Sequence, residues 1–362
     1  MSKLRQLWIP LLLLLAIPVA PVLHYVVGGS PLLVFASGAV AIAVLADWIR
    51  RGTDHITAHV GAALGGLLSI SLGSVAELIL ALFVLWNGKA QVVRSQITGS
   101  ILGTSLLGLG IAIVAGTVGR ESLTFKRERA SLISSLLILV VIALLLPAVF
   151  DYTLRASGHA ANLSLSDEEL SLGVAGVLLL LYVSNMIYTL VTHRDVFASG
   201  GEEEGGGDAW PIGVSLGVLV AATVVIALEA ELVSGALESA STSLGLSETF
   251  LGVIVLALIG TASDLFAGAF FARQGRMGLV LSICIGSAVQ VALVLAPLLV
   301  LISWAIGTPM TLVFENPLDL FAIAGAALII NSIAGDGEVT WFEGVLLIGV
   351  YVLFGLGFYF VT

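Results

Sequence analysis

Residues 73–86 read GSVAELILALFVLW, and residues 260–273 read GTASDLFAGAFFAR. Each stretch places one carboxylate, Glu77 or Asp264, inside an apolar run. The two acids lie 187 residues apart, and a gap-free alignment of 28 positions starting at Gly73 and Gly260 gives eight identities. Ser/Thr, Glu/Asp, Asn/Gln and Lys/Arg pairs account for four more positions. Matched acids, glycines and serines at a fixed spacing indicate an internal duplication.

The composition excludes a soluble globular domain. Of 362 residues, 59% are hydrophobic and 10% are charged, which is too apolar for a hydrated surface. Repeated apolar runs have the length of about 20 residues that crosses a bilayer as a helix. The single cysteine, Cys284, excludes an internal disulfide framework. We therefore expect an all-α polytopic membrane protein.

Eleven apolar runs are predicted to span the membrane. They are Leu7–Val27, Leu32–Ile49, Gly61–Trp86, Ile97–Val118, Leu132–Phe150, Leu170–Val191, Ile212–Val233, Phe250–Ala272, Gly278–Ile302, Leu318–Asn331 and Phe342–Val361. The duplicated units are spans two to six and spans seven to eleven. Because each unit has five spans, an odd number, the second copy enters the membrane in the opposite sense, and the repeats are inverted. The predicted parts are an N-terminal transmembrane helix (1–30), a first repeat (31–197), an acidic linker (198–210) and a second repeat (211–362).

Basic residues in the loops predict the orientation of the chain. With a cytoplasmic N-terminus, 11 of the 14 Lys and Arg residues fall on the cytoplasmic side, as the positive-inside rule requires. We therefore expect a cell-membrane protein with its N-terminus and acidic linker in the cytoplasm and its C-terminus outside. The net charge of −10 indicates either a high-salt habitat or a vestibule that attracts cations.

The two buried acids predict a cation site. An ionised side chain in mid-span costs about 2.5–3.5 kcal/mol even on lenient scales, so such residues are usually functional. Glycines can free backbone carbonyls, and hydroxyls one turn before each acid share its helix face. The predicted cation-binding residues are Glu77, Asp264, Ser74, Thr261, Gly73, Gly260, Gln290, Ser100 and Ser287. These hard oxygen donors suit Ca²⁺, with Mn²⁺ or Na⁺ as further possibilities.

The same two carboxylates predict proton coupling. Burial and mutual repulsion favour their protonated forms when the site is empty, and a bound divalent cation favours their ionised forms. Cation and protons then compete for Glu77 and Asp264. We expect the site to carry Ca²⁺ in one direction and protons back. Glu231, near the predicted end of its span, is a candidate for the access path.

The motifs resemble the calcium/cation antiporter superfamily, specifically its calcium/proton exchanger branch, over nearly the whole chain. Residues Gly73–Glu77 are similar to the signature Gly-Asn-Ala-X-Glu, and Gly260–Leu265 to the signature Gly-Asn-Ala-X-Glu-His. Further similar stretches are GSILGTSLLGLG (Gly99–Gly110), SSLLILVVIALLLPAVF (Ser134–Phe150), LLLLYVSNMIYTLVTHRDVF (Leu178–Phe197), GSAVQVALVLAP (Gly286–Pro297) and DGEVTWFEG (Asp336–Gly344).

The resemblance implies eleven spans, an acidic loop between the halves and transport driven by a proton gradient. It implies that Glu77 and Asp264 bind the cation, that Ser74 and Thr261 take the positions of the signature asparagines, and that Gln290 belongs to the second-half signature.

This chain departs from the family pattern at several site positions. Hydroxyl residues, Ser74 and Thr261, replace the two signature asparagines, and Thr104 stands where an asparagine is usual. Asp264 replaces the second glutamate, and Leu265 replaces the histidine that follows it. An oxygen donor is kept at each site position, but its reach changes. These replacements bear on ion choice and on proton coupling.

Three other functions are compatible with parts of the pattern. An exchanger coupled to Na⁺ (Na⁺/Ca²⁺ or Na⁺/H⁺) would use the same oxygen donors, and a passive channel would show flux without a second gradient. Two buried acids can also form the dyad of an intramembrane aspartyl protease, although an inverted duplication argues against it. We expect a secondary transporter rather than an enzyme, with lipid, cations and protons as partners, no resident cofactor and no nucleic acid.

Overall fold

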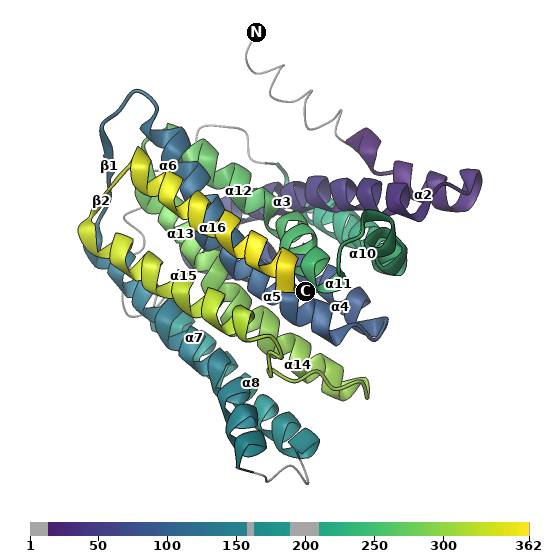
Figure 1. The fold of residues 1–362 in the computed structure, drawn as a ribbon. Helices are drawn as coiled ribbons and strands as arrows, with labels where there is room; N and C mark the ends of the chain where they lie inside the picture. The colour runs from purple at the N-terminus through teal and green to yellow at the C-terminus, as the bar shows by residue number, and fades with distance from the viewer. Residues whose placement is uncertain (1–13, 158–162, 189–209, 362) are drawn as a thin grey trace. The chain divides into compact units, whose positions relative to one another are not determined.

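The computed structural model describes residues 14–157, 163–188 and 210–361; of these, the side chains of residues 60–71 and 163–164 are not described. The described chain is almost entirely helical (Figure 1). Within it, nine helices are long and apolar enough to cross a membrane, and two shorter apolar helices accompany them. The protein is an all-α polytopic membrane protein, as the sequence predicts. Residues 198–209 of the acidic linker and residues 1–13 of the predicted N-terminal segment lie outside the described residues.

The elements follow one another as a series of helices with two short strands. They are η1 (Leu14–Ala16), α2 (Val19–Val22), η2 (Leu23–Val27), α3 (Pro31–Gly73), α4 (Val75–Trp86), α5 (Ala90–Leu102), η3 (Gly103–Gly108), α6 (Leu109–Thr117), β1 (Ser122–Thr124), α7 (Arg127–Ala156), α8 (Leu163–Ile187), α10 (Ile212–Leu244), α11 (Glu248–Phe250), η6 (Leu251–Leu256), α12 (Ala257–Arg273), α13 (Met277–Gln290), η7 (Val291–Leu295), α14 (Ala296–Ala305), α15 (Pro317–Asp336), β2 (Glu338–Thr340) and α16 (Trp341–Val361).

The chain forms two compact units, each made of segments that are distant in sequence. Unit 1 comprises Met1–Val93, Glu203–Ser263 and Thr362, and unit 2 comprises Arg94–Glu202 and Asp264–Val361. These units are a different division from the two sequence repeats, since each contains segments of both. The repeat and linker boundaries therefore stay a prediction.

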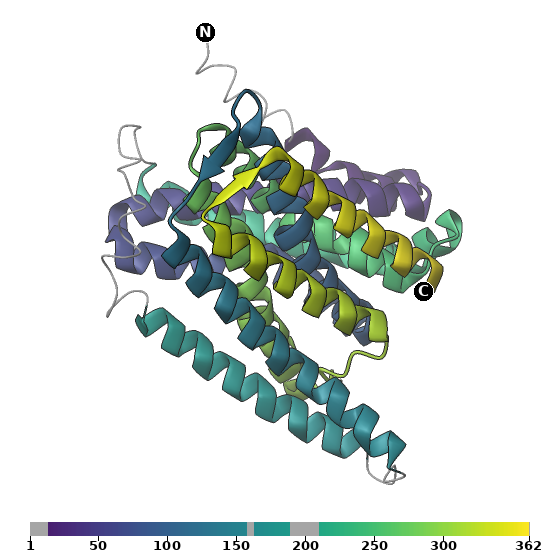
Figure 2. The ribbon, with the colours of Figure 1, turned by 60° about the vertical axis from the view of Figure 1, so that its left-hand side comes forward.

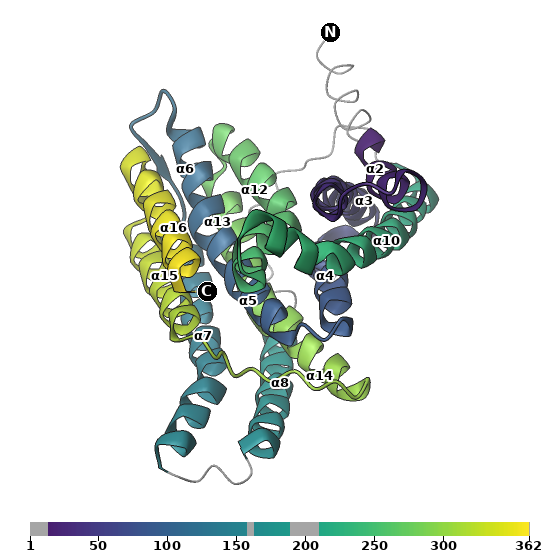
Figure 3. The ribbon, with the colours of Figure 1, turned by 45° about the vertical axis from the view of Figure 1, so that its right-hand side comes forward.

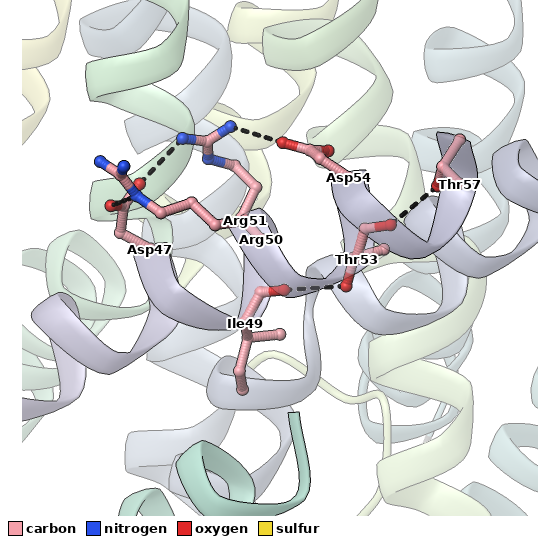
Figure 4. Close-up of polar contacts among 7 residues, drawn as sticks. All are labelled: Asp47, Ile49, Arg50, Arg51, Thr53, Asp54 and Thr57. Atoms are coloured by element: carbon pink, nitrogen blue, oxygen red, sulfur yellow. Dashed lines mark hydrogen bonds and ion pairs between the residues drawn. The ribbon is translucent and has the colours of Figure 1, made fainter. Parts of the chain in front are cut away.

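In unit 1, the predicted boundary between the second and third spans is wrong. A break was expected between Ile49 and Gly61, but α3 runs without interruption for 43 residues, roughly 65 Å at 1.5 Å per residue. In this stretch the charged side chains pair with one another along the helix, and the hydroxyls donate to backbone carbonyls of the same helix (Figure 4). The contacts are Arg50 to Asp47 (2.8 Å), Arg50 to Asp54 (3.0 Å), Arg51 to Asp47 (2.6 Å), Thr53 to the Ile49 carbonyl (2.9 Å) and Thr57 to the Thr53 carbonyl (2.9 Å).

The other long helix of unit 1 is α10, which packs along α3 and α4 (Figure 3). It ends at Leu244, eleven residues beyond the predicted end of the seventh span, where Gly245 adopts a left-handed conformation with φ of 64°. The polar residues after Val233 remain helical, and the hydroxyls of Ser234, Thr242 and Ser243 donate to backbone carbonyls of the same helix. The extension places Glu231 in the middle of a helix rather than near its end. Asn87 at the end of α4 donates to Ser234 of α10 at 2.9 Å, which ties the two helices together.

Unit 2 is a bundle in which α7 packs against α15, α8 and α13, and α6 packs against α16 (Figure 1). The strands β1 and β2 pair antiparallel, with Leu123 opposite Val339, and so join the loop after α6 to the loop after α15 (Figure 2). Helix α15 has 20 residues and is longer than the predicted tenth span. Its N-cap Asn316 accepts a hydrogen bond from the Leu318 amide at 2.9 Å, which fixes where the helix begins.

Local backbone features recur at the 187-residue spacing of the duplication. Gly88 and Gly275 occupy equivalent positions in the repeats, and both adopt left-handed conformations, with φ of 76° and 78°. The π-helical segment η3 begins at Gly103, whose repeat equivalent, Gln290, immediately precedes the π-helical segment η7. Such wide turns are uncommon and often lie at functional sites. Their recurrence indicates that the duplication extends to backbone geometry.

Helices α6 and α16 approach most closely at a pair of glycines. A Cβ atom on Gly110 would lie 2.8 Å from the Gly344 carbonyl oxygen, and one on Gly344 would lie 2.9 Å from the Gly110 carbonyl oxygen. Small residues of this kind allow membrane helices to pack closely.

We expect Gly110→Ala to lower the apparent melting temperature in detergent, because the added methyl group forces the two backbones apart at a cost of about 1–3 kcal/mol. The matched control is Gly349→Ala on α16, where an added Cβ would meet nothing within 4 Å. Equal melting temperatures for the two variants would contradict this packing.

Candidate functional site

Glu77 lies at the start of a short helix inside unit 1. Helix α3 ends at Gly73, Ser74 has φ of −101° and ψ of 15°, and α4 begins at Val75. Glu77 is therefore in the first turn of α4, and its side chain is only 2% exposed. The free amide groups and partial positive charge of a helix N-terminus stabilise a carboxylate there. The helix is thus interrupted directly after Gly73, inside the predicted third span Gly61–Trp86.

The second glycine of the duplication contacts Glu77. A Cβ atom on Gly260 would lie 3.1 Å from Glu77 Cγ and 3.5 Å from its carboxyl carbon. Gly260 does not break its helix, since α12 continues from Ala257 to Arg273. Thr261, which follows it, is 1% exposed and donates its hydroxyl to the Ala257 carbonyl at 2.9 Å. Within unit 1, the structure thus brings Glu77 and Gly260 together, and Gly260 provides space rather than a break.

In unit 2, Asp264 lies on α12 one turn after Gly260, so the two positions share a face of this helix. Its side chain is half-buried, and it interacts electrostatically with Cys284 of α13. The packing is close here, because a Cβ atom on Gly268 would lie 3.2 Å from the Cys284 sulfur. Cys284 is thus a buried core residue beside the carboxylate.

The polar residues predicted around Asp264 lie on two other helices of unit 2. Ser100 of α5 is fully buried, and its carbonyl accepts a hydrogen bond from Thr104 of η3 at 2.8 Å. Ser287 and Gln290 are half-buried and lie three residues apart on α13, which places them on one face. Helix α13 packs against η3. The common role of these side chains as ligands stays a prediction.

Leu265, which stands at the position of the signature histidine, makes an apolar contact. A Cβ atom on Gly108, the last residue of η3, would lie 3.4 Å from Leu265 Cδ1. The side chain at this position therefore faces the π-helical segment in unit 2. At this position the chain therefore has an apolar packing contact, where the family signature has the ring nitrogens of a histidine.

The structure distinguishes two glutamates on α10, while the access-path role of Glu231 stays a prediction. Glu231, the predicted access-path residue, is exposed, whereas Glu229 is 0% exposed. Glu229 was not predicted as a functional residue, although the sequence carries a signal for its burial. Glu229 lies three residues after Ile226 and four before Val233, both buried, so it falls on the apolar face of the helix.

Fold and site together define a class of protein. Membrane helices that carry internally repeated carboxylate motifs, with helix termini and wide turns next to them, are the architecture of secondary transporters. The chain belongs to the sodium/calcium exchanger protein family, whose model matches residues 30–191 and 214–360. It is a transporter and not an enzyme.

The chain is similar to several curated members of this group along nearly its whole length. It is 36% identical to a Ca²⁺/H⁺ antiporter of Aphanothece halophytica over 362 residues, which cover 96% of this chain and 95% of the relative. It is 35% identical to the Ca²⁺/H⁺ antiporter ChaA of Bacillus subtilis over 330 residues, which cover 90% of this chain and 91% of the relative.

Solved structures show the same fold. The structure of native YfkE matches with a TM-score of 0.83 and 30% identity and covers 98% of this chain and 100% of that one. The H⁺/Ca²⁺ exchanger CAX matches with a TM-score of 0.69 at 15% identity, covering 98% of this chain and 92% of that one. At that identity the second match shows the fold alone.

Proposed function

We propose that this chain exchanges Ca²⁺ for H⁺ across the membrane by alternating access. The observation that carries the proposal is the placement of Glu77, a carboxylate 2% exposed in the first turn of a membrane helix and packed against the glycine of the repeated motif. A carboxylate so placed is functional rather than structural in most membrane proteins. The relatives described as Ca²⁺/H⁺ antiporters, at 35–36% identity over nine-tenths or more of the chain, support the choice of ions.

In the proposed mechanism, Glu77 and Asp264 are the anionic ligands of Ca²⁺ and also the proton carriers. Calcium prefers six to eight oxygen ligands, so further donors are needed. We propose that Ser74, Thr261, Ser100, Ser287 and Gln290 supply side-chain oxygens, with backbone carbonyls at Gly73 and Gly260. Calcium is the transported substrate, and no resident cofactor enters the mechanism.

Competition between ions couples the two fluxes. Two carboxylates stripped of water are more stable when protonated, and a divalent cation restores their ionised forms. The binding of Ca²⁺ on one side therefore releases protons to that side, and protonation on the other side releases Ca²⁺. A carrier that changes its facing only when occupied by Ca²⁺ or by protons then exchanges the two.

We propose a location in the cell membrane with the N-terminus in the cytoplasm and the C-terminus outside, because this orientation places 11 of 14 basic residues in the cytoplasm. Cysteine substitution at an exposed residue such as Glu128 tests it, since our topology puts this residue on the cytoplasmic side. In intact cells we expect it to be shielded from a membrane-impermeant thiol reagent.

The test of function uses purified protein in liposomes with an imposed pH gradient. We expect uptake of radioactive Ca²⁺ when the gradient is present and little uptake when a protonophore collapses it. A Na⁺ gradient of equal size, with the pH equal on both sides, tests the Na⁺-coupled alternative. Uptake driven by Na⁺ and indifferent to the pH gradient would replace our proposal with that alternative.

The contact between Gly260 and Glu77 gives a prediction. We expect Gly260→Ala to raise the Ca²⁺ concentration for half-maximal uptake several-fold, because its methyl group at 3.1 Å displaces the Glu77 side chain. Gly278→Ala on α13, where an added Cβ would meet nothing within 4 Å, is the matched control and should transport like the parent. Concentration dependence of initial uptake measures the difference, and coincident curves would contradict the contact's role.

A further inference from the structure

A third carboxylate, Glu229, is buried in the membrane-spanning part of unit 1. It lies on α10, 17 residues after the first residue, Ile212, and 15 before the last, Leu244, so it is close to the middle of the helix. Its side chain is 0% exposed. Neither carboxyl oxygen has a hydrogen-bond partner within the described residues.

The surroundings of Glu229 are apolar and close-packed. A Cβ atom on Gly38 of α3 would lie 3.2 Å from Glu229 Oε2, 2.7 Å from Val233 Cγ2 and 3.6 Å from the Cβ of Ala20. The absence of a side chain at Gly38 is therefore what leaves room for the carboxyl group where α3 passes α10 (Figure 3). Further buried apolar residues lie on both helices: Ile42, Ile226 and Ala230 are each 0% exposed.

Several charged and titratable groups lie on the helices around Glu229. They are Asp47, Arg50, Arg51, Asp54, His55 and His59 on α3, Glu77 on α4, Glu231 and Glu238 on α10, Glu248 on α11, and His24 and Tyr25 on η2. None of them donates to a Glu229 oxygen. Asp47, nine residues beyond Gly38 on α3, is paired with Arg50 and Arg51.

An ionised carboxylate in this position would be unstable. Burial of an unpaired charge is strongly unfavourable even after the protein relaxes, and such a group binds a proton instead. Burial of a neutral carboxylic acid without partners is much less unfavourable. The close packing at Gly38 and the unpartnered oxygens thus favour the protonated form of Glu229.

We propose that Glu229 is a proton-binding residue of the transporter, separate from Glu77 and Asp264. In the conformation described it holds a proton. When the contact between α3 and α10 at Gly38 opens to water, the acid gives that proton to water and becomes a hydrated carboxylate. After the transporter has changed its facing, the carboxylate takes up a proton from the other side, and the contact closes again. This inference rests on the proposed Ca²⁺/H⁺ exchange and adds one proton to its cycle.

The first experiment tests protonation and does not depend on transport. Infrared difference spectra of parent protein and Glu229→Gln, both in lipid at neutral pH, should show the carbonyl band of one protonated carboxylic acid lost in the variant. Glu238→Gln removes an exposed carboxylate from the same helix and should leave that band intact. An identical band in Glu229→Gln and the parent would overturn the proposal, because Glu229 would then be ionised.

The second experiment tests whether this proton moves during transport. A pH-sensitive dye and radioactive Ca²⁺ in the same vesicles give the ratio of protons released to Ca²⁺ taken up. We expect the ratio to fall by about one proton in Glu229→Gln, with Ca²⁺ uptake itself retained. Glu229→Met, of similar length and apolar, should give the same ratio and provides a second folded variant. An unchanged ratio would overturn the proton-carrying role, whereas failure of the parent to exchange Ca²⁺ for H⁺ would instead refute the proposed function.

Discussion

Glu77→Gln should lower Ca²⁺ uptake driven by a pH gradient by roughly 100-fold or more. The substitution keeps the size of the side chain but removes its charge and its exchangeable proton. Loss of one member of a buried charge pair costs about 2–5 kcal/mol, and each 1.4 kcal/mol is about tenfold in affinity. Initial uptake rates in proteoliposomes, measured over a range of Ca²⁺ concentrations, give the size of the effect.

The control for Glu77→Gln is the same chemical change at Glu128. That residue lies in the first turn of α7 and is exposed, so we expect parental uptake. Both variants should elute as single species and melt near the parental temperature, because amide and carboxylate have the same shape. If Glu77→Gln kept more than about a tenth of parental uptake, Glu77 would not be an obligatory ligand and the proposed site would be wrong.

Asp264→Asn should reduce the same uptake to a similar extent. Asp264 is half-buried on α12, and in the proposed mechanism it is the second anionic ligand and the second proton carrier. The conservative variant Asp264→Glu separates charge from shape, since it restores the longer acid of the family signature. We expect Asp264→Glu to keep exchange, with a changed preference between Ca²⁺ and Mn²⁺ because the carboxylate reaches further.

The uptake of Asp264→Asn compared with that of Asp264→Glu distinguishes a functional acid from a structural one. A purely structural acid would show the reverse order, with the smaller change to Asn tolerated and the larger Glu disruptive in a packed helix. Competition of unlabelled Mn²⁺ against radioactive Ca²⁺ measures the change in preference. Full uptake by Asp264→Asn would show that a single carboxylate, Glu77, is sufficient for exchange.

Much of the fold follows from the sequence because the duplication and the hydrophobic runs are strong signals. The matched acids and glycines predicted equivalent local geometry, and the left-handed conformations of Gly88 and Gly275 agree with it. The interruption of the helix at Ser74 agrees with the expectation that glycines here free backbone carbonyls, although Gly61–Trp86 was predicted as one span. Gly260, the repeat equivalent of Gly73, does not interrupt its helix. It leaves space for the side chain of Glu77 instead.

What sequence reasoning missed depends on contacts between helices. Glu229 and Glu231 lie two residues apart in one apolar helix, so composition treats them alike. Their side chains point about 200° apart around the helix axis, and only the passage of α3 at Gly38 decides that Glu229 is the buried one. The continuation of α3 through Arg50 and Arg51 was missed for a related reason: charge was taken as an end of helix, but here it is neutralised along the helix.

The uninterrupted course of α3 has a consequence for how this chain can change in length. Every residue between the charged cluster at Asp47–Asp54 and the helix end at Gly73 turns the backbone by about 100°. Insertion or deletion of a single residue there would rotate the entry into α4, and the direction in which Glu77 leaves it, by that angle relative to the cluster. A substitution in α3 changes only the packing around the substituted side chain. A change in the length of α3, by contrast, changes the angle around the helix axis between the charged cluster and Glu77.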